Sequence, residues 1–245
     1  QQARLVTVNG RRFKRATFQD SAQAQRVAAS LNRLGPTPHL PDLVMASGPE
    51  LWVDYLDGHP FRPEDGAALA RIYDFYAFLY GQDATTTLPL EATALPRDLE
   101  RDLWVLHEVG VLDAPARRVL LERAAARRPA RVQIGFDYMD ARLGNFLWTR
   151  DDVAAGIDVE NLAAECPLGL GLASAHVYWA ATAGPGLGAS LEARGLGHLG
   201  AALPYLGLCY RAALLKRRAL KRRGRLALGD VKAFLEAGPV TGPDA

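Results

Sequence analysis

The stretch Tyr138-Met-Asp-Ala-Arg-Leu-Gly-Asn145 decides the fold, because it places an acidic residue, Asp140, five positions before an amide. A second carboxylate, Asp158, follows thirteen positions after Asn145 at the end of a predicted hairpin. A carboxylate that accepts a proton, together with two hard oxygen ligands, is the set of groups that orients a hydroxyl nucleophile and holds Mg²⁺ on phosphates. The Asp-x-x-x-x-Asn spacing is weak evidence alone, so its context decides its meaning.

Upstream of this stretch the chain begins with a β-rich segment. Asn9-Gly10 separates two β-rich runs and predicts a type I′ hairpin, because both residues tolerate positive φ. Asp20 and Gln23 have the arrangement of a helix cap. The predicted elements are strands over 4–8 and 11–18, a helix over 20–34, and strands over 43–46 and 51–56.

Helical periodicity dominates the chain after residue 60, apart from a short β region around the decisive stretch. The uncharged segment 166–191 is interrupted by glycines, which favours a buried helix over 170–183 and argues against a transmembrane segment. The predicted elements are helices around 69–79, 99–106 and 114–128, strands over 131–136, 146–148 and 154–157, and helices from there onward.

The order of these features resembles the protein-kinase-like superfamily, in particular its aminoglycoside and choline phosphotransferase branch. The resemblance rests on Asp140-x-x-x-x-Asn145, the hairpin after it, and Ile157-Asp158-Val159-Glu160. It implies an α+β, two-lobed fold. Residues 1–57 are expected to form a reduced β-rich N-lobe ending in a hinge near 53–58, and residues 58–245 a mainly helical C-lobe that carries the catalytic loop, 138–145.

The resemblance also implies a role for each matching residue. Asp140 corresponds to the catalytic-loop acid that accepts the substrate hydroxyl proton, and Asn145 and Asp158 correspond to the Mg²⁺ ligands. Arg142 stands where protein kinases often place a lysine toward the γ-phosphate. Lys14 is the best match to the lysine that pairs with the ATP phosphates. Asp54, Tyr55 and Leu56 resemble the hinge that meets the adenine edge.

The expected activity is therefore an ATP- and Mg²⁺-dependent transfer of the γ-phosphoryl group to a hydroxyl. The acceptor is either a small molecule or an anionic saccharide or lipid headgroup. An alternative is a pseudokinase that binds a nucleotide or partner without turnover, because the chain departs from the family pattern. Tyr138-Met139 replaces a His-Gly pair, the helix after Lys14 lacks a glutamate, and few residues precede the lysine strand for a glycine-rich loop.

Composition and missing motifs narrow the classes of protein to which the chain could belong. With 49% apolar and 23% charged residues and two cysteines, the chain is typical of a globular protein, and a reducing cytoplasmic location is expected. CxxC, HExxH and GxSxG motifs are absent, which argues against zinc and serine-hydrolase chemistry. The segment 211–225 is basic and holds no acid. It is either a solvated helix face or a contact for phosphate or an anionic surface, and a nucleic-acid partner is the weaker expectation.

Overall fold

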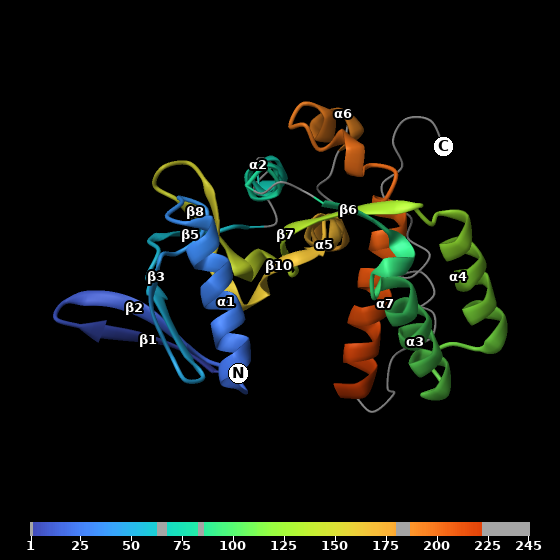
Figure 1. Cartoon of the computed structure of the whole chain (residues 1–245), viewed down its shortest axis with the longest axis horizontal. Helices are drawn as coiled ribbons and strands as arrows, with labels where there is room; N and C mark the ends of the chain where they lie inside the picture. Colours follow the sequence, from blue (N-terminus) through green and yellow to red (C-terminus); the bar gives the residue numbers. More distant parts are fainter. Residues whose placement is uncertain (1, 63–67, 83–85, 180–186, 222–245) are drawn as a thin grey trace. The chain divides into compact units, whose positions relative to one another are not determined.

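The chain forms two compact units in a computed structural model that describes residues 2–62, 68–82, 86–179 and 187–221 (Figure 1). The first unit comprises residues 1–84 and 135–166, and the second comprises residues 85–134 and 167–245. The residues of each unit pack mainly against one another. The predicted lobe boundary between residues 57 and 58 stays a prediction.

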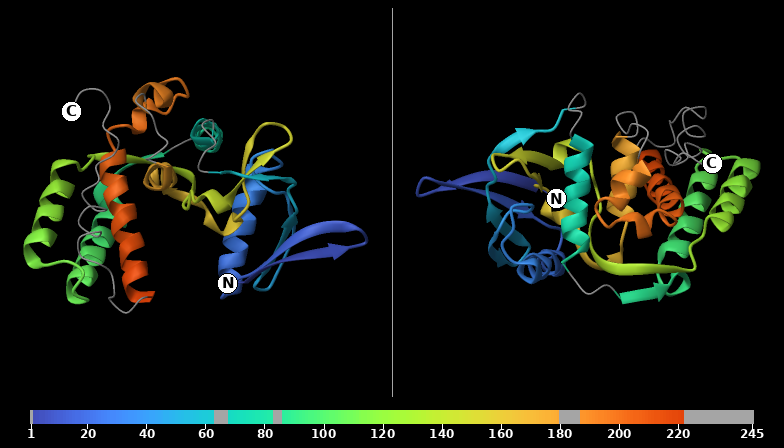
Figure 2. Two further views of the ribbon diagram at one scale, coloured as in Figure 1. Left: turned by 180° about the vertical axis from the view of Figure 1, so that it is seen from behind. Right: turned by 90° about the horizontal axis from the view of Figure 1, so that it is seen from above.

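An antiparallel sheet of order β1-β2-β4-β3 opens the first unit (Figure 2). Its strands are β1 (Gln2–Val8), β2 (Arg11–Thr17), β3 (Leu43–Ser47) and β4 (Glu50–Asp54). Val8 pairs with Arg11, and the two intervening residues, Asn9 and Gly10, have φ values of 50° and 79°. The predicted two-residue hairpin is confirmed, because these are the positive φ values that a type I′ turn requires.

Helix α1 (Ser21–Leu34) follows β2 and packs against β3 and β4. The Asp20 carboxylate caps it by accepting a hydrogen bond from the Gln23 N–H at 2.7 Å, as the sequence predicted. Gly35 ends the helix with a φ of 69°. The apolar stripe at helical spacing is buried, including Val27 and Leu31. The predicted β-β-α-β-β order is therefore confirmed.

The remainder of the first unit surrounds the decisive stretch. A second sheet has the order β5-β8-β9, and β8 and β9 form the hairpin that the sequence predicted. Its strands are β5 (Gly58–Pro60), β8 (Phe146–Thr149) and β9 (Ala154–Gly156). Helix α2 (Ala68–Tyr80) contacts β9 and buries Phe75 and Tyr76 completely. Strand β5 was not predicted, because a three-residue Gly-His-Pro strand has no periodicity to detect.

A third sheet has the order β10-β7-β6. Its strands are β6 (Thr86–Pro89), β7 (Arg131–Tyr138) and β10 (Leu162–Pro167). Strand β7 ends at Tyr138, so it delivers the chain into the decisive stretch. The expectation that helices alone follow residue 157 is wrong at β10. Its sequence has weak strand propensity, and the pairing with β7 overrides that propensity.

The second unit is mainly helical. Helices α3 and α5 both pack along α7, and α4 lies against α3 (Figure 1). The helices are α3 (Leu95–Glu108), α4 (Ala114–Ala126), α5 (Leu170–Trp179), α6 (Leu187–Glu192) and α7 (Leu203–Lys221). The predicted helix over 170–183 is present to residue 179, and the rest of it lies outside the described residues. Among the helices of the described ranges, none is both long and apolar enough to cross a membrane.

The predicted basic segment is part of this packing. Arg211 on α7 is 7% exposed, and Lys216 forms an ion pair with Asp102 of α3, whose side chain is 4% exposed. Arg217 and Arg218 lie on the exposed side of the helix. Residues 222–225 of the segment lie outside the described residues. The solvated-face interpretation therefore fits only part of the segment within α7.

Candidate active site

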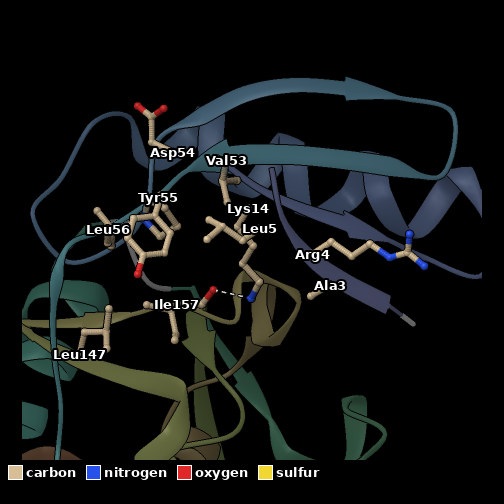
Figure 3. Close-up of a pocket in the computed structure, with 11 residues that line it drawn as sticks. Ala3, Arg4, Leu5, Lys14, Val53, Asp54, Tyr55, Leu56, Leu147 and Ile157 are labelled. Carbon is tan, nitrogen blue, oxygen red and sulfur yellow. Dashed lines mark hydrogen bonds between the residues drawn. The ribbon is translucent and has the colours of Figure 1, made fainter. Parts of the chain in front are cut away.

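In the first unit, Lys14 on β2 connects the β1-β2-β4-β3 sheet to the segment that follows β9. Its ammonium group donates a hydrogen bond to the carbonyl oxygen of Ile157 at 2.8 Å, drawn in Figure 3, and forms an ion pair with Asp158. The Lys14 side chain is 18% exposed and that of Asp158 is 33% exposed. Sequence analysis assigned these two residues to nucleotide phosphate and to metal, and the structure brings them into direct contact.

A cavity of about 290 Å³ lies beside Lys14, within the same unit. Tyr55 and Leu56 lie on one side of it, and Leu147 and Ile157 lie on the other (Figure 3). The wall is mostly apolar, and Lys14 and Arg4 are the cationic residues among those that line it. A space of this size is at the lower end of small-ligand pockets and suits a flat ring system next to an anionic group.

The predicted hinge residues Asp54, Tyr55 and Leu56 all line this cavity. The Asp54 carboxylate is directed away from it (Figure 3) and accepts two hydrogen bonds from Arg11 Nη2, at 2.9 and 2.7 Å. The Tyr55 N–H donates to the Arg12 carbonyl oxygen at 3.3 Å, which continues the pairing beyond β4. Residues 54–56 therefore line the cavity, while the Asp54 carboxylate is held on the outside by Arg11.

The predicted catalytic loop folds around Asp140, which is 6% exposed. The Asn145 side chain donates from Nδ2 to the Asp140 carbonyl oxygen at 2.9 Å, so the two ends of the Asp-x-x-x-x-Asn motif meet. Arg142 Nε donates to both carboxylate oxygens of Asp140, at 3.0 and 2.8 Å. Arg142 thus binds the acid itself in this structure, and its predicted role toward phosphate stays a prediction.

No family model matches the chain, and no curated protein matches its sequence. Solved structures do match. The choline kinase LicA from Streptococcus pneumoniae has a TM-score of 0.63 at 11% identity, covering 96% of this chain and 87% of its own. The Plasmodium vivax ethanolamine kinase also has a TM-score of 0.63, at 10% identity, covering 96% and 80%.

An aminoglycoside phosphotransferase, APH(4)-Ia, in ternary complex with AMP-PNP and hygromycin B, has a TM-score of 0.62 at 13% identity, covering 98% of this chain and 94% of its own. The chain has a protein-kinase-like fold of the choline and aminoglycoside phosphotransferase type. This confirms the predicted α+β fold class, with a small antiparallel-sheet N-lobe and a helical C-terminal part. At these identities the likeness concerns the kinase-like fold alone.

Tyr138 precedes Asp140 by two residues, and its side chain is fully buried. Its hydroxyl accepts a hydrogen bond from the Asp158 N–H at 3.0 Å and donates one to the Asn145 carbonyl oxygen at 3.2 Å. The Asn161 side chain also hydrogen-bonds to it. Burial raises the pKa of Tyr138 well above its usual value, with Asp158 as a smaller contributor, so the hydroxyl keeps its proton.

Gly156 makes room for this tyrosine. A β-carbon at position 156 would lie 2.9 Å from Cε2 and 3.0 Å from Cζ of Tyr138, which is closer than such atoms pack. The ring has edge contacts with Phe75, at 5.4 Å between ring centroids, and a tilted contact with Phe146 at 5.3 Å. The Tyr138 ring therefore occupies the space that a side chain at position 156 would need.

Glu160 is the residue that sequence reasoning left without a role. Its Oε2 lies 3.8 Å from Lys14 Nζ, and its side chain is 15% exposed. Lys14 is thus flanked by two carboxylates, Asp158 and Glu160, from one short segment. The signal was present in the sequence, because α1 carries no acidic residue while Ile157-Asp158-Val159-Glu160 carries two.

The predicted metal ligands, Asn145 and Asp158, lie on two chain segments that are joined by a backbone hydrogen bond. The Ile157 N–H donates to the Asn145 carbonyl oxygen at 2.9 Å, next to Asp158 in the chain. The described ranges contain no group of three or more His, Cys, Asp or Glu side chains arranged to hold a metal. One carboxylate and one amide oxygen fit Mg²⁺, which prefers few protein ligands and completes its shell with water and phosphate oxygens.

Proposed function

We propose that this protein is an ATP-dependent phosphotransferase that transfers the γ-phosphoryl group to a hydroxyl of a small molecule. The observation that carries the proposal is the contact of Lys14 with Asp158 at the side of a cavity walled by residues 54–56. A flat base between Leu56 and Ile157 would leave its phosphates near the Lys14 ammonium group. Structural neighbours with the same fold were solved with AMP and with AMP-PNP, which supports a nucleotide in this cavity.

Each residue then has a defined task in the transfer. Asp140 accepts the proton of the acceptor hydroxyl, whose oxygen forms a bond to the γ-phosphorus while the bond to the β,γ-bridging oxygen breaks and ADP leaves. Lys14 offsets negative charge on the phosphates, and Arg142 does the same once it turns from Asp140. Asn145 and Asp158 would hold Mg²⁺, which supplies further charge neutralisation when bound.

The acceptor is best sought among small hydroxylated molecules. The neighbours described above are named as choline and ethanolamine kinases and as an aminoglycoside phosphotransferase bound to hygromycin B. An anionic saccharide or lipid headgroup is the second acceptor class, and α7 would contribute Arg217, Arg218 and Lys221 to it. The lobe boundary at residues 57 and 58 and a cytoplasmic location belong to the same proposal.

The test is a thermal-shift titration with ATP, in Mg²⁺ and again in EDTA, on wild type and Asp158→Ala. A ligand that binds only the folded state raises its stability with concentration, so even modest affinity is visible. We expect a Mg²⁺-dependent shift in wild type that is lost in Asp158→Ala and kept in Asp151→Ala, a matched change at the exposed turn between β8 and β9. An equal shift in all three proteins, or none in wild type, would contradict the proposal.

A second candidate is a pseudokinase that binds nucleotide without turnover. It is favoured by Arg142, which engages both carboxylate oxygens of Asp140, the group that has to receive a proton. ADP release in the presence of amino alcohols, aminoglycosides and macrolides separates the two candidates. Mg²⁺-dependent binding of ATP favours the pseudokinase if no ADP forms with any of these acceptors. The same holds only if the protein also does not slowly hydrolyse ATP in their absence.

A further inference from the structure

One hydroxyl group joins the two chain segments that carry Asn145 and Asp158. The Tyr138 hydroxyl accepts from the Asp158 N–H at 3.0 Å and donates to the Asn145 carbonyl oxygen at 3.2 Å. These two residues are thirteen positions apart, with the whole β8–β9 hairpin between them. The β8–β9 pairing also joins these segments, and the hydrogen bond between the Ile157 N–H and the Asn145 carbonyl oxygen, at 2.9 Å, lies next to it.

The hydrogen bonds of the Ile157 N–H and of the Asp158 N–H hold different parts of the chain. The bond from Ile157 fixes the residue before Asp158, and the bond to the Tyr138 hydroxyl fixes the peptide plane of Asp158 itself. A peptide plane held at its N–H sets the direction in which the following Cα–Cβ bond leaves the backbone. The Tyr138 hydroxyl holds this peptide unit at the Asp158 N–H, and Lys14 Nζ holds it at the Ile157 carbonyl oxygen, so both contribute to where the Asp158 carboxylate begins relative to Asn145.

The phenol ring is held firmly enough to act as a spacer. It is fully buried, it packs against Phe75 and Phe146, and it occupies the space that a side chain at position 156 would need. The Tyr76 hydroxyl donates to the Tyr138 carbonyl oxygen at 2.7 Å, a hydrogen bond that does not involve the phenol hydroxyl or Asp158. A rigid aromatic ring with one hydroxyl keeps its hydrogen-bond partners at a constant separation.

We infer that Tyr138 is a positioning residue whose hydroxyl sets the mutual placement of Asn145 and Asp158, and thereby the affinity of this pair for a nucleotide-bound divalent cation. The inference rests on the proposed function, because it concerns the same site. Outer partners that orient metal ligands change metal affinity by about 10- to 100-fold when they are removed. Tyr138 touches neither the cation nor the nucleotide in this account.

The experiment measures Mn²⁺ binding with AMP-PNP present, from the electron paramagnetic resonance signal of free Mn²⁺, in wild type, Tyr138→Phe and Tyr76→Phe. Both variants remove one buried hydroxyl that donates to a backbone carbonyl, and only the first removes the link to Asp158. We expect Mn²⁺ affinity to fall by about 10- to 100-fold in Tyr138→Phe and to stay at the wild-type level in Tyr76→Phe. AMP-PNP binding in EDTA should be equal in all three proteins.

Several results would overturn the inference. Wild-type Mn²⁺ affinity in Tyr138→Phe would make Tyr138 a packing residue, and an equal loss in both variants would indicate general loosening of the site. Absence of nucleotide-linked Mn²⁺ binding in wild type would remove the proposed function and this inference together, and the wild-type sample alone reveals that case.

Gly156→Ala provides a second route if Tyr138→Phe does not fold. This variant keeps the hydroxyl and forces the ring to move, because the added β-carbon meets Cε2 at 2.9 Å. It should lower Mn²⁺ affinity in the presence of AMP-PNP while leaving AMP-PNP binding in EDTA unchanged. Wild-type Mn²⁺ affinity in Gly156→Ala would contradict the inference.

Discussion

The ammonium group of Lys14 contacts the carboxylate of Asp158, 144 positions further along the chain. Both side chains are more than half buried, and neither charge lies in the interior without an opposite charge beside it. Such a pair positions a cation and a metal ligand before any phosphate arrives, so less ordering is left for the binding step. In the proposed reaction, a nucleotide shares Lys14 with Asp158.

Replacement of Lys14 by methionine should lower kcat/KM for ATP by about 100-fold, the loss typical of one preorganised donor to developing charge. Methionine keeps the length and the apolar stem, so the cavity wall survives. Arg15→Met is the matched control, because Arg15 is the next residue on β2, points to the opposite face and pairs with Glu50 at 3.6 Å. Equal kcat/KM values for ATP in both variants would show that Lys14 does not act in the site.

Replacement of Asp140 by asparagine should reduce phosphoryl transfer by about 100- to 10,000-fold, because an amide cannot accept the hydroxyl proton. Nucleotide binding, measured by thermal shift, should stay at the wild-type level, since Asp140 does not line the cavity. Asp151→Asn is the control for a neutralised carboxylate nearby. Full transfer activity in Asp140→Asn would remove Asp140 from the proton-accepting role.

Stability should fall as the pH drops from about 6.5 to 4, because of His176 on α5. Burial, with a smaller contribution from Arg211, lowers the pKa of His176 to about 4 in the folded state. The unfolded chain then binds more protons across this interval, so stability is present above the unfolded pKa and is lost as the pH falls. The loss is at most about 3 kcal/mol.

Urea unfolding at pH 7.5 and at pH 4.5 measures this effect. His176→Gln should flatten the pH dependence of the unfolding free energy, and His198→Gln, a change at an exposed histidine, should leave it as in wild type. A pH dependence in His176→Gln equal to that of wild type would assign the acid sensitivity to other groups.

The ion pair of Lys216 with Asp102 should contribute strongly to the stability of the second unit. Within the described residues, Lys216→Met leaves the buried Asp102 carboxylate paired with Arg101 at 3.6 Å, which should cost about 3 kcal/mol. The double variant Asp102→Leu/Lys216→Met should recover most of that loss. Lys221→Met, at the exposed end of α7, is the control in thermal unfolding. An equal melting temperature in Lys216→Met and Lys221→Met would show that the pair is not stabilising.

The sequence was sufficient for elements whose signals are local. The positive φ values at Asn9 and Gly10 and the cap at Asp20 depend on residues within three positions of one another, and the structure has both. Strands β5 and β10 could not be predicted, because their short segments become strands only by pairing with β8 and β7. Local propensity carries no information about such partners.

The same distinction applies to the candidate site. A motif of known spacing indicated Asp140, Asn145 and Asp158, and the hinge followed from the order of strands. The hydroxyl bridge of Tyr138 had no sequence signal, because hydrogen bonds to two backbone groups require a three-dimensional position. The two acids of Asp158-Val159-Glu160 were visible in the sequence, whereas the 3.8 Å approach of Glu160 to Lys14 was not, since it depends on the three-dimensional position of this segment.

The close approach of Gly156 to Tyr138 also makes the residues that fit at these two positions depend on each other. The atoms that an alanine at 156 would meet are Cε2, Cζ and the hydroxyl oxygen, all at the far end of the phenol side chain. A smaller residue at 138 lacks these atoms, so it leaves space for a β-carbon at 156. The destabilisation caused by Gly156→Ala should therefore be smaller when Tyr138 is replaced by a smaller residue.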